Sequence, residues 1–291
     1  MPVLGRHMPL DGHPLAAFVI AKDLGCETIQ LFVGNPRGWL PMPERLDEIS
    51  ALAEGLRVGG FKPIVIHAAY LINLASSTEE TRLRSRRLLR WTVERGAAIG
   101  AHAVVIHIGS HGGAGLDIGI AHLVAGLSEV LTDLPPGPQI LLENDVGAGN
   151  TIGSRFDAMA AVLAQLDEPF GARLGVCLDT AHLWGAGFDI GTPDAANTTL
   201  AHIDATVGLA RVGVIHLNDT VTALAGHRDL HARLGEGSIG AAGLRTFLLD
   251  PRLSDAAIIL ETPIKDLPGS DKHDWEHDRT QIQAARELLS D

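Results

Sequence analysis

The sequence contains few cysteines and no long apolar run. Only two of its 291 residues are cysteines, Cys26 and Cys177, each within an apolar segment, so a disulfide framework is not supported. No apolar stretch reaches the roughly 18 residues that a membrane span needs. The N-terminus lacks the charged region followed by an apolar one that marks a signal peptide. We therefore expect a cytoplasmic protein with two buried thiols and no membrane partner.

An excess of basic residues is also absent, since the formal net charge is −12. A protein that binds nucleic acid through phosphate attraction is normally basic. Taken alone, the charge argues against a nucleic-acid partner. The objection weakens if several carboxylates are metal ligands, because bound divalent ions return positive charge at the place where a phosphate would lie.

What the sequence does contain is an alternation of short β-rich runs and longer helix-like stretches. Runs such as Ile64–Ile66 and Ile258–Leu260 are continuously apolar, which is typical of parallel strands buried on both faces. Eight strands, each followed by a helix, predict a (β/α)8 TIM barrel. A doubly wound open sheet would need a glycine-rich phosphate turn after its first strand, and none is there. Single barrels commonly reach this length, so we expect one catalytic domain over residues 1–291.

The pattern gives approximate bounds for these elements. The predicted strands are Val3–Gly5, Thr28–Phe32, Ile64–His67, Ala103–His107, Gln139–Glu143, Leu174–Asp179, Val212–His216 and Ala257–Glu261. The predicted helices include Pro43–Gly55, Glu79–Ile99, Ser154–Gln165, Thr198–Ala210 and Thr280–Leu289. Ser77 with Glu80 three residues later is the pattern of a capping box before the second of these helices.

Six of the predicted strands run through apolar residues and end in a residue that can bind a metal. These residues are His67, His107, Glu143, Asp179, His216 and Glu261. The C-terminal ends of barrel strands form the face where active sites are built. Buried carboxylates and imidazoles would be unfavourable there by several kcal/mol without compensation, and metal ions are the natural compensation. Histidines and carboxylates without a thiolate suit zinc, manganese or iron.

Three further residues of the same types lie close by in the sequence. His182 follows Asp179 by one helical turn, and Asp229 and His231 form an Asp-x-His pair after the seventh strand. An Asp-x-His pair alone is a weak signal, because loops are generally polar. Together, however, the three residues are enough for another metal ion.

With these nine residues, the sequence resembles the endonuclease IV family of apurinic/apyrimidinic (AP) endonucleases. The resemblance spans nearly the whole chain in the order of the family. The matching segments are His67–Leu74, Glu143–Asn144, Gly175–His182, His216–Asp219, Asp229–His231 running into Leu234–Gly237, and Leu260–Thr262. All nine positions where the family places its metal ligands have the expected residue type.

The resemblance implies three Zn²⁺ ions per chain, with Mn²⁺ also accepted at some positions. His67, His107 and Glu143 would hold the first ion. Glu143 would bridge to the second ion, which Asp179, His216 and Glu261 complete. The third ion would be bound by His182, Asp229 and His231.

The resemblance also implies the reaction and the partner. Metal-bound water, with its pKa lowered toward ~7, would supply hydroxide, and Glu261 would help to orient or deprotonate it. The bond cut is the phosphodiester 5′ to an abasic site in double-stranded DNA, which leaves a 3′-hydroxyl and a 5′-deoxyribose phosphate. Arg37 and Tyr70 match the family's side chains that enter the duplex while the abasic nucleotide swings out. One active site per barrel requires no partner subunit, so we expect a monomer.

Three residues depart from the usual family pattern. Ala181 replaces a cysteine, Leu230 replaces an arginine between Asp229 and His231, and Asp145 replaces a threonine. None of them is a ligand position, so the metal site should be retained. Asp145 adds negative charge near the metals, which would weaken phosphate binding.

Two other functions fit parts of the pattern. A metal-dependent sugar isomerase or epimerase of the xylose-isomerase-like barrels shares the fold and could use Glu143, Asp179, His216 and Glu261, but it would not require the other five ligands. A non-catalytic metal-binding or DNA-scaffolding module is the second alternative, against which a complete ligand set with room for water argues. Nearly three metal ions per chain would favour the endonuclease, one or two the isomerase, and none the scaffold.

Overall fold

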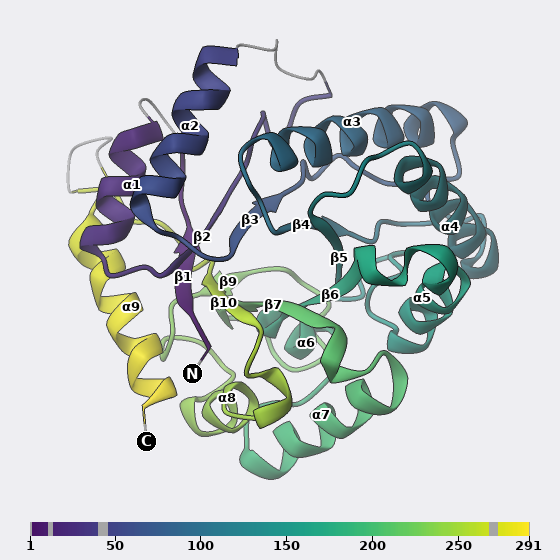
Figure 1. The fold of residues 1–291 in the computed structure, drawn as a ribbon. Coiled ribbons are helices and arrows are strands. Elements are labelled where there is room, and N and C mark those ends of the chain that lie inside the picture. The colour runs from purple at the N-terminus through teal and green to yellow at the C-terminus, as the bar shows by residue number, and fades with distance from the viewer. Residues whose placement is uncertain (1, 11–13, 40–45, 268–272, 291) are drawn as a thin grey trace.

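The computed structural model describes residues 2–10, 14–39, 46–267 and 273–290, and it is a closed barrel of eight parallel strands surrounded by helices (Figure 1). The strand order around the barrel is β1-β10-β7-β6-β5-β4-β3-β2, so each strand lies beside its neighbours in the chain and β10 closes onto β1. The predicted (β/α)8 fold is confirmed.

All the barrel strands are four to six residues long. They are β1 (Leu4–His7), β2 (Thr28–Leu31), β3 (Ile64–His67), β4 (Ala103–His107), β5 (Gln139–Glu143), β6 (Leu174–Asp179), β7 (Val212–Leu217) and β10 (Ala257–Leu260). A two-stranded antiparallel hairpin, β8 (Asp219–Thr220) and β9 (His231–Ala232), follows β7.

The helices cover the outside of this barrel. They are α1 (Pro14–Asp23), α2 (Leu46–Gly59), α3 (Glu79–Ala98), α4 (Leu116–Thr132), α5 (Phe156–Phe170), α6 (Thr180–Ala186), α7 (Pro193–Thr206), α8 (Ala241–Leu248) and α9 (Trp275–Leu289). The start predicted for α2 at residues 43–45 lies outside the described residues. Among the helices of the described ranges, none combines the length and the apolar composition that crossing a membrane requires.

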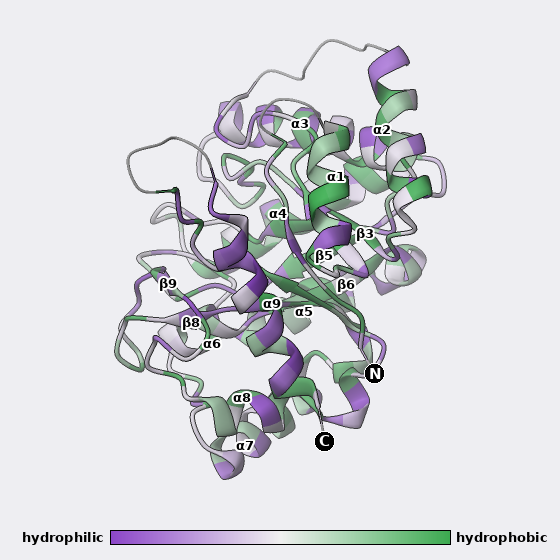
Figure 2. Cartoon of the chain, turned by 90° about the vertical axis from the view of Figure 1, so that its left-hand side faces the viewer, coloured by the Kyte–Doolittle hydropathy of each residue, from purple (hydrophilic) through white to green (hydrophobic). Residues whose placement is uncertain are grey.

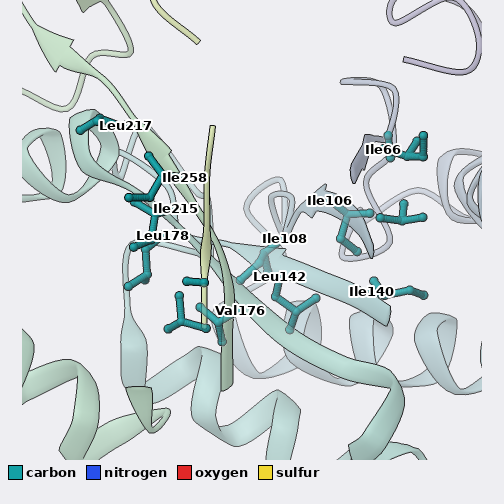
Figure 3. Close-up of a cluster of buried hydrophobic side chains, with 14 of the residues drawn as sticks. Ile66, Ile106, Ile108, Ile140, Leu142, Val176, Leu178, Ile215, Leu217 and Ile258 are labelled. Carbon is teal, nitrogen blue, oxygen red and sulfur yellow. The ribbon is translucent and has the colours of Figure 1, made fainter. Parts of the chain in front are cut away.

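The core has two layers, which follow from the alternation of side chains along each strand. Outward-facing residues such as Ile66, Ile106 and Ile215 pack against the helices (Figure 3). The inward-facing residues of six strands form a second cluster inside the barrel: Val65, Ala103, Val105, Leu141, Cys177, Val214 and Ile259. The cartoon coloured by hydropathy shows the hydrophobic strands in the middle of the molecule, with the β8–β9 hairpin at the end away from the two termini (Figure 2).

Several bounds of the predicted helices were wrong: α9 begins at Trp275 and not at Thr280, and the ends of α2, α5 and α7 differ from the predicted ones by four or five residues. Two helix starts show why. The N-cap of α3 is Thr78 rather than Ser77, and its side chain makes no capping hydrogen bond; its hydroxyl donates to Thr81 Oγ1 (2.7 Å). Helix α7 begins at Pro193, five residues before the predicted start at Thr198. Thr192 is its N-cap, with Oγ1 accepting a hydrogen bond from the backbone N–H of Ala195 (3.3 Å).

The cap of α7 gives a prediction about stability that is independent of the site. Thr192→Ala removes the acceptor for an otherwise unpaired N–H, so it should lower the free energy of unfolding by about 1 kcal/mol. Urea denaturation would measure this change. Thr198→Ala, in the exposed interior of the same helix, is the matched control and should change stability by less than about 0.5 kcal/mol. Equal losses in the two variants would contradict the capping role.

Candidate metal centre

Polar side chains at the C-terminal ends of the strands meet at one end of the barrel. Each of six strands has an inner core residue followed, two positions later, by a residue that can bind a metal. These six residues are His67, His107, Glu143, Asp179, His216 and Glu261. Because side chains alternate with a period of two, these residues point inward like the core residues before them. Neighbouring strands bring them level, since His107 pairs with Glu143 and Asp179 pairs with His216 in the strand registers.

The remaining two strands contribute inward-facing residues that are not among the predicted site residues. His7 at the end of β1 and Gln30 in β2 are register partners. Gln30 donates from Nε2 to Glu261 Oε1 (2.6 Å), and His7 Nδ1 lies 3.2 Å from the same oxygen. The predicted strands ended at Gly5 and ran to Phe32, so neither residue stood at a predicted strand end. Continuing the alternation by one step would have indicated His7.

Glu143 lies at the centre of the cluster and is 1% exposed. Its Oε2 is 3.3 Å from Nε2 of both His67 and His107, and its Oε1 is 3.0 Å from Nδ1 of His216. The same His216 nitrogen is 3.3 Å from Oε2 of Glu261. One carboxylate is therefore shared between two groups of ligand-type residues.

A second part of the cluster forms where helix α6 and the β8–β9 hairpin approach each other. His182 lies in the first turn of α6, whose N-cap is Asp179, and Asp179 Oδ1 accepts a hydrogen bond from the His182 backbone N–H (2.8 Å). Asp229 precedes β9. Its two carboxylate oxygens lie 3.4 Å from His182 Nε2 and 3.1 Å from His231 Nε2. The Asp-x-x-His and Asp-x-His pairs of the sequence are thus brought together.

Four of the five histidines predicted as ligands are oriented by a hydrogen bond from one ring nitrogen to a fixed oxygen. A carbonyl oxygen can only accept, so the ring nitrogen facing it must carry the proton, and the other nitrogen is left facing the carboxylates. The pairs are His67 Nδ1 with the carbonyl of Ala68 (2.8 Å), His182 Nδ1 with that of Asn144 (2.9 Å), His231 Nδ1 with that of Glu261 (3.4 Å), and His216 Nε2 with Oε1 of Gln30 (2.9 Å).

Asn218 orients the carboxylate of Asp179. Its Nδ2 donates to Asp179 Oδ2 (2.7 Å), while its Oδ1 accepts from the backbone N–H of Glu261 (3.2 Å). Asn218 is fully buried. It therefore connects two ligand-type residues, one at the end of β6 and one just after β10.

The electrostatics of the cluster favour added positive charge. Burial alone would raise the pKa of Glu143, but the imidazoles of His107 and His216 hold it well below its ordinary value. Burial would lower the pKa of His231, but the carboxylates of Asp179 and Asp229 raise it to about 9. The pKa of Asp229, whose side chain is half exposed, is lowered in turn, since the neighbouring His182 and His231 outweigh the effect of its partial burial. The carboxylates of Glu143 and Asp229 are thus ionised, and the ring nitrogens that face them need either a proton or a metal ion.

The residues present fit metal ions. Glu143 Oε2 and His231 Nε2 are buried and have no hydrogen-bond partner among the described residues. Three groups of ligand atoms, each within 4.8 Å of one another, are His67, His107 and Glu143; Glu143, Asp179, His216 and Glu261; and Asp179, His182 and His231. A further such group pairs Cys177 with Glu143 and His216. Burial raises the pKa of the Cys177 thiol to about 12, which opposes the thiolate that a metal would need.

Arg37 and Tyr70 lie on two adjoining loops at the rim of the site. The backbone N–H of Tyr70 donates to the carbonyl of Pro36 (3.0 Å), and the Arg37 side chain is exposed. Tyr70 is 51% exposed, with its ring 5.5 Å from that of His67 and 5.4 Å from that of Phe32. A cavity of about 1030 Å³ opens beside the cluster, and Tyr70, His231 and Glu261 are part of its lining.

None of the three departures from the family pattern belongs to a group of ligand-type residues, although the charge of Asp145 acts on His107. The Asp145 carboxylate accepts hydrogen bonds from the backbone N–H of Gly147 (2.7 Å) and from Thr151 Oγ1 (2.6 Å), so it is engaged by its own loop. Ala181 is buried, at 2% exposure. The Leu230 side chain is 39% exposed.

The chain is similar in sequence to known proteins over nearly its whole length. The family described as xylose isomerase-like TIM barrel matches residues 18–290. A protein of Halothermothrix orenii named "Probable endonuclease 4" is 39% identical over 260 residues, which cover 89% of this chain and 93% of that protein. A protein of the same name from Chloroflexus aurantiacus is 35% identical over 286 residues, covering 98% and 100% of the two chains.

Solved structures give the same result for the fold. The crystal structure of endonuclease IV from Thermus thermophilus superposes with a TM-score of 0.83 at 34% identity and covers 99% of both chains. A D-tagatose 3-epimerase-like protein superposes with a TM-score of 0.71 at 18% identity, covering 99% of this chain and 97% of the other. At that identity, the second likeness shows the shared barrel alone.

Proposed function

Because the chain belongs to the endonuclease IV family of xylose isomerase-like TIM barrels, we propose that it is a DNA-repair endonuclease that hydrolyses the phosphodiester 5′ to an abasic site. The products would be a 3′-hydroxyl and a 5′-deoxyribose phosphate. The substrate would be double-stranded DNA. One barrel contains every residue of the proposed site, so the proposal requires one domain and no second chain.

The observation that best supports a metal-dependent reaction is the anchoring of the imidazoles. Metal-binding histidines typically donate their second ring N–H to a carbonyl, amide or carboxylate oxygen, which fixes the tautomer. His67, His182, His216 and His231 all make such a bond and direct their other nitrogen toward the carboxylates of the cluster. A cluster of histidines stabilised only by packing would have no reason to share this orientation.

We assign the ligands to three Zn²⁺ ions, with Mn²⁺ accepted at some positions. His67, His107 and Glu143 would hold the first ion; Glu143, Asp179, His216 and Glu261 the second; and His182, Asp229 and His231 the third. Metal ions in these places would supply Lewis acidity and lower the pKa of water at neutral pH.

The protein's own groups would position the substrate and the attacking water. The Glu261 carboxylate, which is hydrogen-bonded by Gln30, would orient or deprotonate that water. The exposed side chains of Arg37 and Tyr70 would enter the duplex and stabilise the extruded nucleotide. Extrusion is least costly at an abasic site, which has no base to unpair, and the cavity beside Tyr70 and Glu261 offers space for its sugar.

The test is the cleavage of a duplex oligonucleotide with one abasic site, beside an undamaged duplex, with and without a chelator and added Zn²⁺. Incision at the lesion alone, which requires metal and leaves a 3′-hydroxyl, is the expected result. Absence of incision by a protein that contains a full complement of metal would overturn the proposal and favour the sugar isomerase or epimerase.

Tyr70 provides a prediction about substrate selection. Tyr70→Ala should retain its bound metal, because Tyr70 is not among the proposed ligands and its side chain is half exposed. It should lose discrimination: the ratio of incision at abasic and undamaged sites should fall about tenfold or more, which corresponds to about 1.4 kcal/mol. Leu83→Ala removes a comparably exposed side chain from α3 and should leave the ratio unchanged. An unaltered ratio in Tyr70→Ala would rule out the wedge.

A further inference from the structure

Gln30 makes contacts within the cluster that no other described side chain reproduces. It lies in β2, is fully buried, and is the only one of the four acceptors orienting the imidazoles that is a side chain rather than a backbone carbonyl. Its carboxamide lies between two ligand-type residues: Nε2 is 2.6 Å from Glu261 Oε1, and Oε1 is 2.9 Å from His216 Nε2.

The hydrogen-bonding capacity of these groups leaves one arrangement. An ionised carboxylate can only accept, so the NH2 end of the amide must face Glu261, and the carbonyl oxygen must face His216. That oxygen is an acceptor, so His216 must carry its proton on Nε2. Nδ1 is then the nitrogen that faces the carboxylates of Glu143 and Glu261, at 3.0 and 3.3 Å, where it can take a metal ion or a second proton.

The amide also accounts for the orientation of its neighbours. With Oε1 of Glu261 held by Gln30, Oε2 is the oxygen left facing His216 Nδ1. The amide nitrogen of Gln30 also lies 3.0 Å from His7 Nδ1, which ties the residue at the end of β1 into the same network. Gln30 therefore sets the orientation of one carboxylate and one imidazole, which stand at the ends of β10 and β7.

We propose that Gln30 is a positioning residue of the metal centre, which selects the His216 tautomer and the Glu261 rotamer needed to bind the second ion. This inference rests on the proposed metal-dependent function. Gln30 itself would bind neither metal nor DNA. Substitution of Gln30 should nevertheless change metal binding, which substitution of a residue that only packs would not do.

The test uses the full-length protein with Gln30→Met, which preserves the length of the side chain but removes both the donor and the acceptor. Gln30→Ala is the second variant, in case the first does not fold, and Gln139→Met is the matched control, at the exposed start of β5. Three properties are measured: the equilibrium affinity for Zn²⁺ by chelator competition, the visible spectrum of the Co²⁺-substituted protein, and incision at an abasic site.

Loss of the hydrogen-bonded partner of a metal ligand typically lowers metal affinity or activity by about 10- to 100-fold. In either Gln30 variant, we expect the affinity for the weakest-bound Zn²⁺ ion to fall by that factor and the Co²⁺ spectrum to change. In Gln139→Met, we expect neither to change. Wild-type affinity and spectrum in a folded Gln30 variant would overturn the inference while leaving the proposed function intact. A wild-type protein that neither binds Zn²⁺ nor cuts abasic DNA would overturn both.

Discussion

Glu143→Ala should abolish metal binding at the centre of the cluster and lower incision by about 10³-fold or more. The carboxylate is the one described group that faces His67, His107 and His216 together, so its removal takes a ligand from two of the three proposed ions. Metal ions contribute several kcal/mol of transition-state stabilisation, and each 1.4 kcal/mol corresponds to about tenfold in rate. Metal content per chain and incision of abasic duplex are the two measurements.

The barrel should still fold in this variant. Removing Glu143 also removes a buried negative charge, and the imidazoles around it can remain neutral once that charge is gone. Far-UV circular dichroism and thermal unfolding of the metal-free proteins would check this. Glu129→Ala, which removes a half-exposed carboxylate of α4 paired with Arg86, is the matched control. Its surface ion pair is worth at most about 1 kcal/mol. Near-normal incision by Glu143→Ala would show that the central carboxylate is not a ligand.

The barrel and the positions of the six strand-end residues could be predicted because both depend on local alternation. A strand such as Val65-Ile66-His67 has an inner residue, an outer residue and then an inner residue again, so the core residue determines which way the histidine points. Closing the barrel then brings the six ends together. No long-range information was needed beyond the expectation that eight parallel strands close.

The residues that were missed depend on contacts between distant parts of the chain. Gln30 stands one residue before the end of β2 and two before the predicted end, where nothing local distinguishes it from a core position. It becomes recognisable only once β10 places Glu261 within 2.6 Å of it. The early start of α7 differs, because Thr192 followed by Pro193 is a local signal for a helix start. The start of this helix could therefore be predicted from the sequence.

The β8–β9 hairpin could not be predicted either, because one carboxylate in it binds backbone groups that follow much later in the chain. Asp219 is 1% exposed. Its Oδ1 accepts from the backbone N–H groups of Thr220 (2.8 Å) and Ile239 (3.1 Å), and its Oδ2 accepts from those of Gly235 (3.2 Å) and Gly237 (3.0 Å). The segment thus fastened follows directly after β9, which begins at His231. A Cβ at Gly237 would lie 2.1 Å from Asp219 Oδ1, so the approach requires glycine.

Asp219→Asn should therefore reduce stability and disturb the part of the site that contains Asp229 and His231. The amide replaces one acceptor oxygen with a donor, which leaves two backbone N–H groups facing an N–H. Each unsatisfied buried donor costs about 1–3 kcal/mol. The N–H groups of Gly235 and Gly237 are only partly buried, so a loss of about 1–3 kcal/mol is expected in denaturant unfolding of the metal-free protein.

The same substitution should lower the affinity for one metal ion and leave the affinity for the other two unchanged. Asp219 is not one of the proposed ligands, and its hairpin supplies residues to the third ion only, so the ions assigned to Glu143 should keep their affinity. Asp255→Asn, in an exposed turn before β10, should change neither stability nor metal content. Uniform loss of all bound metal in Asp219→Asn would mean that the hairpin supports the whole centre. Wild-type stability together with wild-type metal content would mean that the four hydrogen bonds to Asp219 do not hold the loop that we assign to the third ion.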